Sequence, residues 1–489
     1  MTAAIAARPA SRFRVRPRPR FTELVLLAIV AVALVVGAVS LGATEQLRAA
    51  TEAGKAVRRL DFLPPDPQGL LVYLLGLAAV HAGFVLAGRR TDQVLLPTVG
   101  MLGGIGLLLM QRLPQNLVVQ SFGSAELGLG QLQLAWLLVA LAVVGVLGLA
   151  VRSDTWLRTY KYTWAAAGIG LLLLVFVFGS EVNGARLSLS IGPVTGQPSE
   201  LLKVILVVFL AAYLSENRAL LAEESTRIGP VRLPPLPYLA PMVVMWAIAL
   251  GIVVVQRDLG AALLFFAIFL SLLYIATGRP SYVVLGLLLF AGGAIVLYSL
   301  FGHVQARVDN WLDPWRDPQG AGFQVVQALY AFGRGGILGV GLGAGLPTIG
   351  GRLPIPAVHS DYPLAALGEE LGLVGLLALL GLYLVVVSRG LRIAAASHDD
   401  FRSLLAAGLA LVVGIQAFII AAGNLKLIPL TGITLPFISY GGSSLLANAV
   451  VVGLLIALSD RGIEPPPAPR DRKRHLPRLS RLRRARVAP

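Results

Sequence analysis

The sequence predicts an all-α membrane protein that crosses the bilayer about twelve times, with both termini in the cytoplasm and one large extracellular loop. Hydrophobic residues make up 56% of the 489 residues, charged residues make up 13%, and the mean hydropathy is +0.78. A water-soluble domain carries about 25% charged residues. The apolar residues also fall into long runs, as membrane-spanning helices require.

Twelve apolar runs have, or approach, the length of about 20 residues that a spanning helix needs. An even number of spans places both termini on one side. The run 199–214 is the shortest and contains Glu200 and Lys203. The predicted spans are residues 22–42, 69–88, 93–110, 132–151, 162–179, 199–214, 238–256, 258–276, 281–300, 363–388, 402–423 and 440–458.

The distribution of Lys and Arg indicates which side is cytoplasmic. With both tails inside, the inner segments contain 28 Lys or Arg and the outer segments contain 12. Cytoplasmic loops carry such an excess of positive charge. The outer side then receives the long loop 301–362, the turn at Gln256–Asp258, and the segments Asn183–Glu200 and Pro429–Gly442.

Composition divides the chain into a basic tail (1–21), N-terminal spans (22–151), a core (152–459) and a second basic tail (460–489). Residues 1–20 contain six Arg and no acid, and residues 460–489 contain ten Lys or Arg and three acids. Such basic, Pro-rich segments are typical of disordered chain lying against anionic membrane lipids. No aromatic residues interleave with the C-terminal arginines, so we expect no nucleic-acid partner.

Two classes of chemistry are disfavoured by composition. The chain contains no Cys, which excludes disulfides, thiolate metal ligands and a Cys nucleophile. The five His are scattered without helical spacing, so a His-rich metal site is not expected.

Arg257 and Asp258 separate two long apolar runs. An ionisable residue at the membrane edge usually faces a wet cavity or a charged partner. Asp is equally suited to cap the N-terminus of the following helix, so both interpretations stay open. Arg257 on its own favours an interfacial anchor over a phosphate ligand.

The stretch Gly-Gln-Pro-Ser-Glu-Leu-Leu-Lys, residues 196–203, predicts the start of a helix at Pro198 and Ser199. Glu200 and Lys203 then lie on one helix face and form a local ion pair. A buried Lys203 requires an anion, and a diphosphate group would serve as well as Glu200.

Two further polar stretches flank the last spans. His359-Ser360-Asp361-Tyr362 ends the long outer loop, and Glu369 and Glu370 follow on different faces of the next helix. The glycines between 335 and 345 favour a hinge over a phosphate-binding backbone. In Pro-Phe-Ile-Ser-Tyr-Gly-Gly-Ser-Ser, residues 436–444, we expect Ser443 or Ser444 to cap the last helix, and no neighbouring base supports a catalytic serine.

In this order, and with these spans between them, the four stretches resemble the RodA/FtsW family of shape, elongation, division and sporulation proteins, from about residue 160 to 460. Two spans precede the usual ten, as in the longer RodA-type proteins. Two motifs differ from the family pattern. Arg257 replaces the proline before Asp258, and Gly184-Ala185-Arg186-Leu187-Ser188 shifts the arginine of a Gly-Ala-x-Arg-Trp motif and lacks its tryptophan.

The resemblance implies a peptidoglycan glycosyltransferase that polymerises lipid II into glycan strands at the outer face of the bacterial cytoplasmic membrane, in elongation rather than division. Its implied partner is a class B penicillin-binding protein, a transpeptidase. Asp258 matches the family's essential aspartate. The remaining motif matches, together with Arg257, give the substrate-binding candidates Ser199, Glu200, Lys203, Arg257, Asp361, Glu370, Ser439, Ser443 and Ser444.

Lipid II is α-linked and its polymer is β-linked, so one inverting displacement is expected. We expect Asp258 to accept the proton of the acceptor hydroxyl. Lys203, Arg257 and a divalent cation, magnesium or manganese, are candidates to stabilise the leaving diphosphate. Glu200, Asp361 and Glu370 are the candidate ligands of that cation. A lipid II flippase and a non-catalytic scaffold are the alternative functions.

Overall fold

The computed structural model describes residues 17–54, 62–113, 127–182, 185–191, 194–223, 226–228, 231–233, 257–345 and 354–460, and the isolated positions 240, 243–244, 247–248 and 251. Within these residues the chain is almost entirely helical, and nine helices are long and apolar enough to cross a membrane. The prediction of an all-α, multi-pass membrane protein is confirmed. The predicted span 238–256 lies largely outside the described residues.

Eleven apolar helices of the described chain coincide with the other predicted spans. Nine of them meet the length of a membrane crossing, and α3 and α16 are shorter apolar helices. They are α1 (Phe21–Glu52), α2 (Pro67–Leu86), α3 (Leu95–Gln111), α5 (Leu129–Ala150), α7 (Lys161–Phe178), α8 (Pro198–Glu223), α10 (Leu259–Thr277), α11 (Pro280–Leu300), α14 (Pro363–Ala396), α15 (Asp400–Asn424) and α16 (Gly442–Leu458).

The remaining elements are short and connect these helices. Helix α6 (Thr155–Thr159) precedes α7, and three outer-loop elements follow α11: α12 (Gly302–Leu312), the 3-10 helix η1 (Pro314–Arg316) and α13 (Phe323–Gly335). Strands β1 (Ser180–Val182), β2 (Ala185–Ile191) and β3 (Val194–Gly196) form a small antiparallel sheet between α7 and α8. A second hairpin pairs β4 (Thr226–Ile228) with β5 (Val231–Leu233).

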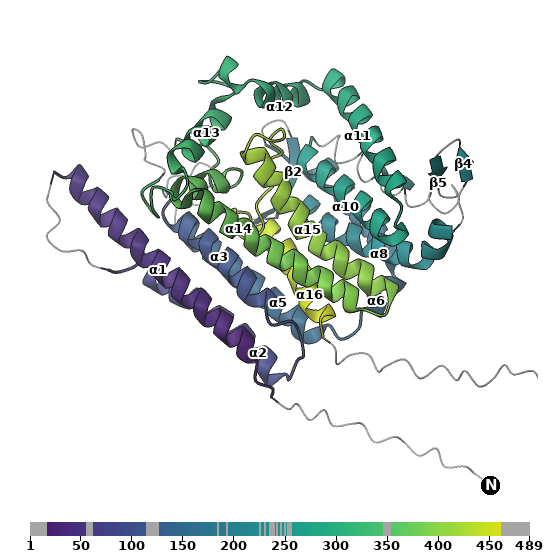
Figure 1. Cartoon of the computed structure of the whole chain (residues 1–489), viewed down its shortest axis with the longest axis horizontal. Helices are drawn as coiled ribbons and strands as arrows, with labels where there is room; N and C mark the ends of the chain where they lie inside the picture. Colours follow the sequence, from purple (N-terminus) through teal and green to yellow (C-terminus); the bar gives the residue numbers. More distant parts are fainter. Residues whose placement is uncertain are drawn as a thin grey trace, which may run out of the picture.

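Helices α8 and α15 form the centre of the bundle. In their most apolar stretches 83% and 78% of the residues are buried, whereas none are buried in the corresponding stretch of α11. Helix α15 packs against α14, α8, α10 and α16. Figure 1 shows α11, α12 and α13 forming an arch beyond the ends of these central helices.

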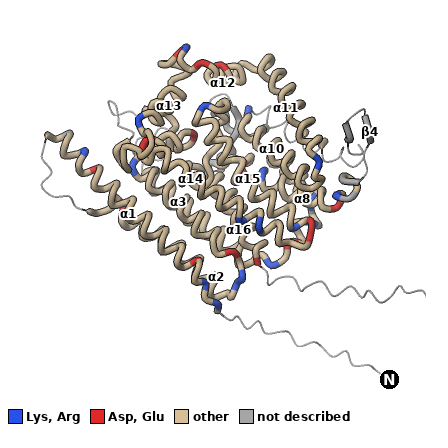
Figure 2. The backbone as a smooth tube through the Cα atoms, in the orientation of Figure 1, with Lys and Arg blue, Asp and Glu red and all other residues tan. Residues whose placement is uncertain are grey.

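Charged residues gather at the ends of the helices and leave their middles apolar (Figure 2). One end of the bundle contains Asp258 and Glu200, at the starts of α10 and α8. The other end contains Asp460 and Arg402, which lie after α16 and in the first turn of α15. Helix α8 ends and α10 begins at opposite ends of the bundle. This separation matches the charge pattern of a chain that crosses a membrane.

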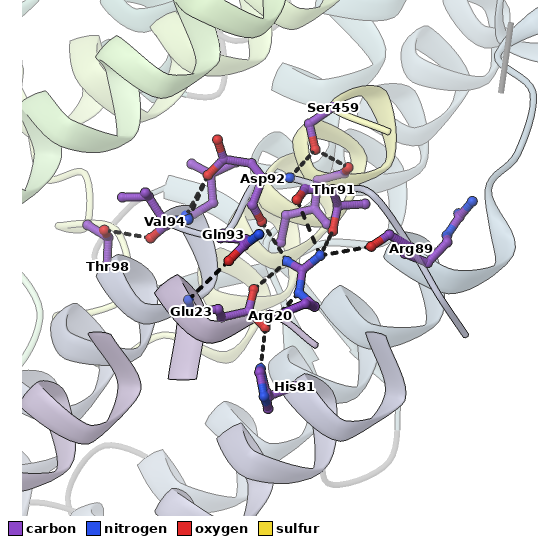
Figure 3. A network of polar contacts seen from close by, with 12 residues as sticks. Arg20, Glu23, His81, Arg89, Thr91, Asp92, Gln93, Val94, Thr98 and Ser459 are labelled. Carbon is purple, nitrogen blue, oxygen red and sulfur yellow. Dashed lines mark hydrogen bonds and ion pairs between the residues drawn. The ribbon is translucent and has the colours of Figure 1, made fainter. Parts of the chain in front are cut away.

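A buried polar network joins the N-terminal helices to the core at the end opposite Asp258 (Figure 3). The Arg20 guanidinium pairs with Glu23 and donates to the carbonyl oxygens of Arg89, Thr91 and Asp92 at 2.9–3.2 Å. Arg20 was predicted to belong to the disordered tail 1–21, but its side chain is only 2% exposed. The ordered chain therefore begins before the first apolar run.

The loop before α3 extends this network to α14 and α16. The carboxylate of Asp92 accepts hydrogen bonds from the Val94 and Leu95 amides and pairs with Arg389 of α14. The Asp92 amide donates to the Ser459 hydroxyl at 2.8 Å. Arg89 pairs with Asp460 at 2.9 Å and donates to two carbonyls at the end of α5. A few side chains thus join helices from both halves of the chain.

We predict that Arg20→Gln lowers stability by about 3–5 kcal/mol, because the buried Glu23 carboxylate loses its arginine partner and is left with the His81 ring nitrogen at 2.6 Å. The measurement is the thermal denaturation midpoint of the purified protein in detergent. Arg18 is exposed, so Arg18→Gln serves as the matched control and should leave the midpoint unchanged. The double variant Arg20→Gln/Glu23→Gln should recover part of the loss, and no recovery would contradict the ion-pair explanation.

Candidate functional site

The predicted residues Ser199, Glu200, Lys203 and Asp258 line one small cavity. Its volume is about 40 Å³, and its walls come from α8, α10, α15 and the loop before α16. Gln416, Gly432 and Thr434 complete the polar side. Residues that are far apart in the sequence therefore converge at the end of the bundle that was predicted to face outward.

Asp258 fills both of the roles that its sequence position left open. Its carboxylate caps α10 by accepting the Ala261 amide at 3.0 Å, and it also lines the cavity. Burial raises the pKa of the Asp258 carboxyl above its usual range, while hydrogen bonds from Ala261 and Ser199 and the charge of Arg307 lower it. A carboxylate with a raised pKa is better suited to accept a proton near neutral pH.

Lys203 is the most completely buried charge of the cavity, with a side chain only 1% exposed. Its ammonium donates to Glu200 Oε2 at 2.6 Å, to Gln416 Oε1 at 2.7 Å and to Asn448 Oδ1 at 3.3 Å. The predicted pair with Glu200 is present, and α15 and α16 supply the other two acceptors. A buried ammonium is stable only with such a full set of partners.

A chain of hydroxyl and amide groups continues from this pair into α16. Gln416 donates to the Thr434 carbonyl at 2.8 Å, and the Thr434 and Ser444 hydroxyls are 2.6 Å apart. The Asn448 amide returns to Ser444 Oγ at 3.2 Å. The expectation that Ser443 or Ser444 caps α16 is wrong: Gly441 occupies the cap position without a side-chain bond. Ser444 instead supports the wall of the cavity from inside the helix.

Arg257 adopts a left-handed backbone conformation, with φ at +68°. Proline fixes φ near −65°, so a proline at this position is incompatible with the observed turn. The turn before Asp258 in this chain therefore requires a residue other than proline at position 257. The Arg257 side chain is exposed and lies outside the cavity beside Asp258.

The loop that ends in Asp361 is held against the segment before α16. Ser439 Oγ donates to the Ser360 carbonyl at 2.6 Å and accepts the Leu435 amide at 2.8 Å. The Tyr440 amide donates to the His359 carbonyl at 2.8 Å. Burial raises the pKa of the Asp361 carboxyl to about 6, and the Ser360 hydroxyl and the Arg307 charge oppose that rise. Ser439 thus positions the Asp361 loop and does not line the cavity.

Glu370 lies away from the cavity. Its side chain is 1% exposed and forms an ion pair with Arg112, which follows α3, while Glu369 pairs with Arg334 of α13 at 2.7 Å. Each of the two adjacent carboxylates thus pairs with an arginine. A direct contact between Glu370 and a substrate in this cavity is not supported by its position.

A second and much larger cavity lies beside the first, between α10, α11 and α12. Its volume is about 770 Å³ and its lining is almost entirely apolar, including Phe266, Leu270 and Phe290. Arg307 and Thr431 line the same cavity. An apolar groove with a cation among its lining residues is suited to a lipid with a charged head group.

Arg307 is the residue of the site that the sequence analysis missed. Its guanidinium donates to the carbonyls of Thr431 at 3.0 Å and Leu430 at 3.5 Å. Gly432 follows Thr431 in the chain and lines the Asp258 cavity. A Cβ placed on Gly432 would lie 3.9 Å from Arg307 Nη2. In the sequence Arg307 is one arginine in an amphipathic stretch of the outer loop, a pattern that does not predict a binding role by itself.

The candidate metal ligands do not converge. Glu200 binds Lys203, Glu370 binds Arg112, and Asp361 lies in a separate loop. Among the residues that the structure describes, no group of three or more His, Asp or Glu could hold a metal ion. These side chains therefore do not fit a shared cation site. The side chain of Arg186, the shifted arginine, lies outside the described residues.

A family model described as a cell cycle protein, FtsW/RodA/SpoVE, matches residues 93–462. The chain belongs to the FtsW/RodA/SpoVE family. It is 39% identical over 400 residues to the peptidoglycan glycosyltransferase RodA of Mycobacterium tuberculosis, covering 80% of this chain and 84% of that one. It is 37% identical over 330 residues to a probable peptidoglycan glycosyltransferase FtsW of Geobacter sulfurreducens, covering 66% and 83%.

Two solved structures have a similar fold. One was described in a study of how a peptidoglycan synthase complex coordinates polymerisation and crosslinking, and it matches with a TM-score of 0.58 at 28% identity, covering 76% of this chain and 98% of that one. The rod shape determining protein RodA of Thermus thermophilus matches with a TM-score of 0.51 at 26% identity, covering 76% and 97%. Helices α1 and α2 precede the residues that the family model matches.

We predict that Arg257→Gly leaves glycan polymerisation nearly unchanged, because glycine adopts a positive φ without strain and the Arg257 side chain does not line the cavity. Arg257→Pro should reduce polymerisation strongly, because it forces the residue before Asp258 out of its observed conformation. The measurement is the initial rate with labelled lipid II. Equal losses in both variants would show that the charge of Arg257, and not the turn, is required.

Proposed function

We propose that this family member polymerises lipid II into glycan strands at the outer face of the bacterial cytoplasmic membrane, with Asp258 as the general base. The observation that carries the proposal is the position of Asp258: its carboxylate lines a polar cavity beside a large apolar groove. In enzyme class the chain is a RodA-like peptidoglycan glycosyltransferase, as the names of its relatives and its family membership support.

The reaction is one displacement with inversion at the donor's anomeric carbon. The acceptor hydroxyl attacks that carbon, a new carbon–oxygen bond forms, and the bond to the diphosphate breaks. The acceptor proton passes to Asp258, and the electron pair of the broken bond leaves with the diphosphate. A single carboxylate base suffices, whereas a retaining mechanism would require a second carboxylate as nucleophile.

The groove between α10, α11 and α12 is proposed to hold the polyprenyl tail of lipid II. Its apolar lining favours a hydrocarbon chain, and none of the most apolar stretch of α11 is buried, so the groove has a wall that faces lipid. The head group then lies at the end of the groove near Arg307. The donor sugar attached to that diphosphate then lies beside Gly432, at the mouth of the Asp258 cavity. The cavity of about 40 Å³ has room for the hydroxyl of a second, acceptor saccharide but not for a sugar ring.

Arg307 is proposed to stabilise the negative charge that develops on the leaving diphosphate. Two of its hydrogen bonds go to backbone carbonyls, which orient the guanidinium without neutralising it. Arginine binds phosphate groups well because its planar donors match their oxygens. Lys203 has three acceptors already and lies deeper, so its role is to organise the cavity rather than to contact the diphosphate.

A role in cell elongation with a class B penicillin-binding protein as partner is part of the proposal. It is supported by RodA relatives that match about 80% of this chain, and by the peptidoglycan synthase complex that contains a structural neighbour. The basic tails are proposed to contact anionic membrane lipids. A flippase or a scaffold would not need a carboxylate with a raised pKa beside a lipid-sized groove.

The test is polymerisation of labelled lipid II by the purified protein, with and without the transpeptidase. Asp258→Asn should lower the rate by at least about 100-fold, the usual contribution of a general base. Asp309→Asn changes an exposed carboxylate of α12 and is the matched control, with an unchanged rate expected. Strands from both variants would remove Asp258 from the mechanism.

A translocation measurement in lipid vesicles, made alongside the polymerisation assay, separates the alternative functions, and the polymerisation assay also checks the pH dependence. Wild-type protein that translocates lipid II in vesicles but forms no strands would favour a flippase, and one that does neither would favour a scaffold. Burial raises the pKa of Asp258, so the rate should fall on acidification at a pH above the value of about 3.9 for an exposed Asp.

A further inference from the structure

Helix α1 contacts the outer loop directly, although it precedes the residues that the family model matches. A Cβ placed on Gly343 would lie 3.2 Å from the Cβ of Thr44 and 3.6 Å from the Leu41 carbonyl oxygen. Two turns earlier on the same helix, Gly37 approaches the Leu342 side chain. The outer half of α1 therefore packs closely against the loop segment 342–345.

Arg112 binds this loop segment through its guanidinium. Its Nη2 donates to the Gly345 carbonyl at 2.6 Å and to the Gly343 carbonyl at 3.4 Å, and its Nη1 pairs with Glu370. Burial lowers the pKa of the Arg112 guanidinium to about 10, and the nearby carboxylates of Glu45 and Glu369 raise it. Glu45 belongs to α1, so α1 contributes a charge as well as a packing surface.

Residues 336–341 of the same loop form backbone hydrogen bonds with α14 at the point where that helix is interrupted. Gly372 has φ at +64° and ψ at −168°, which interrupts the helix. The freed carbonyls of Glu369 and Glu370 accept the Val340 and Gly341 amides, both at 3.0 Å. The Leu373 and Val374 amides donate back to the Gly336 and Ile337 carbonyls at 3.0 and 3.1 Å. The glycines of this loop therefore allow its backbone to pack directly against the backbone of α14.

The part of α14 before this break begins just after the Asp361 loop. Asp361 lies two residues before Pro363, and Glu370 lies in the last turn before Gly372. One short helical segment, residues 363–371, therefore connects the Asp361 loop to the residues that contact Arg112 and the loop segment 342–345. A helix break at a glycine leaves the angle of such a segment to be fixed by its surroundings.

We propose that α1 is a positioning element for the candidate site: through Thr44 it holds the loop segment 342–345, which Arg112 joins to Glu370, and so it fixes the part of α14 before Gly372 and, with it, the Asp361 loop. The inference rests on the proposed function, because Ser439 and Tyr440 join the Asp361 loop to the segment before α16, and Thr434 of that segment lines the Asp258 cavity. It gives the N-terminal helices a role in setting the rate of polymerisation. Thr44, Arg112 and Glu370 are positioning residues and do not contact substrate.

The test compares two tryptophan substitutions in α1. Thr44→Trp places a large ring against Gly343 and should displace the loop, whereas Val36→Trp changes a residue of the same helix that is 62% exposed. Thr44→Ser is the conservative variant that should retain the wild-type properties. All variants are studied in the full chain, and the thermal denaturation midpoint confirms that each one is folded.

Two readouts are taken on each variant. The first is the distance between spin labels at Leu338→Cys and Phe178→Cys, two exposed positions in a chain without native cysteine. The second is kcat and KM for lipid II. Thr44→Trp should shift or broaden the label distance and lower kcat by about 10- to 100-fold with little change in KM, the effect of a small misplacement of active-site groups.

Three results would overturn the inference. The first is an unchanged label distance in Thr44→Trp, and the second is a shifted distance with an unchanged kcat. The third is an equal loss of kcat in Thr44→Trp and Val36→Trp. Failure of the wild type to form strands would instead contradict the proposed function. The label distances still separate the two in that case, because they report the loop position without any reaction.

Discussion

The burial of the Lys203 ammonium is the constraint on which the candidate site depends. An ammonium with 1% exposure must be compensated by nearby acceptors, and these come from α8, α15 and α16. Meeting this requirement brings Gln416 and Asn448 to one point, and Gln416 in turn holds Thr434. Asp258 reaches the same cavity from the start of α10. One charge thereby joins three helices and, through Gln416, the loop that carries Thr434.

The positions of the spans could be predicted because a bilayer accepts only segments that satisfy their own backbone, and hydropathy reports this directly. Eleven of the predicted runs coincide with helices of the described chain, although α1 extends to Glu52, well beyond its predicted end at residue 42. The local pair of Glu200 and Lys203 was equally readable from helical spacing. The partners of Lys203 were not, because Gln416 and Asn448 are 213 and 245 residues away and meet it only through packing.

The site differs from the sequence-based candidates mainly in which polar groups face the cavity. Glu370 and Ser439 belong to the recognised motifs but do not line the cavity. Glu370 pairs with Arg112, and Ser439 donates to the Ser360 carbonyl. Arg307 carries no motif signal that was recognised, yet it lies between the apolar groove and the polar cavity. Motif membership therefore identified the region, and only the fold separates residues that line the cavity from residues that hold it in shape.

The account joins the two cavities into one binding site, with a lipid tail in the groove and a sugar hydroxyl at Asp258. The most direct measurement is an experimental structure of the Asp258→Asn variant with bound lipid II. The account predicts the tail of a donor lipid II between α10 and α11, the donor's diphosphate at Arg307, and the hydroxyl of a second, acceptor lipid II about 2.6–3.2 Å from the side chain at position 258, within hydrogen-bond reach. A lipid bound elsewhere on the bundle, with its head group remote from this cavity, would contradict it.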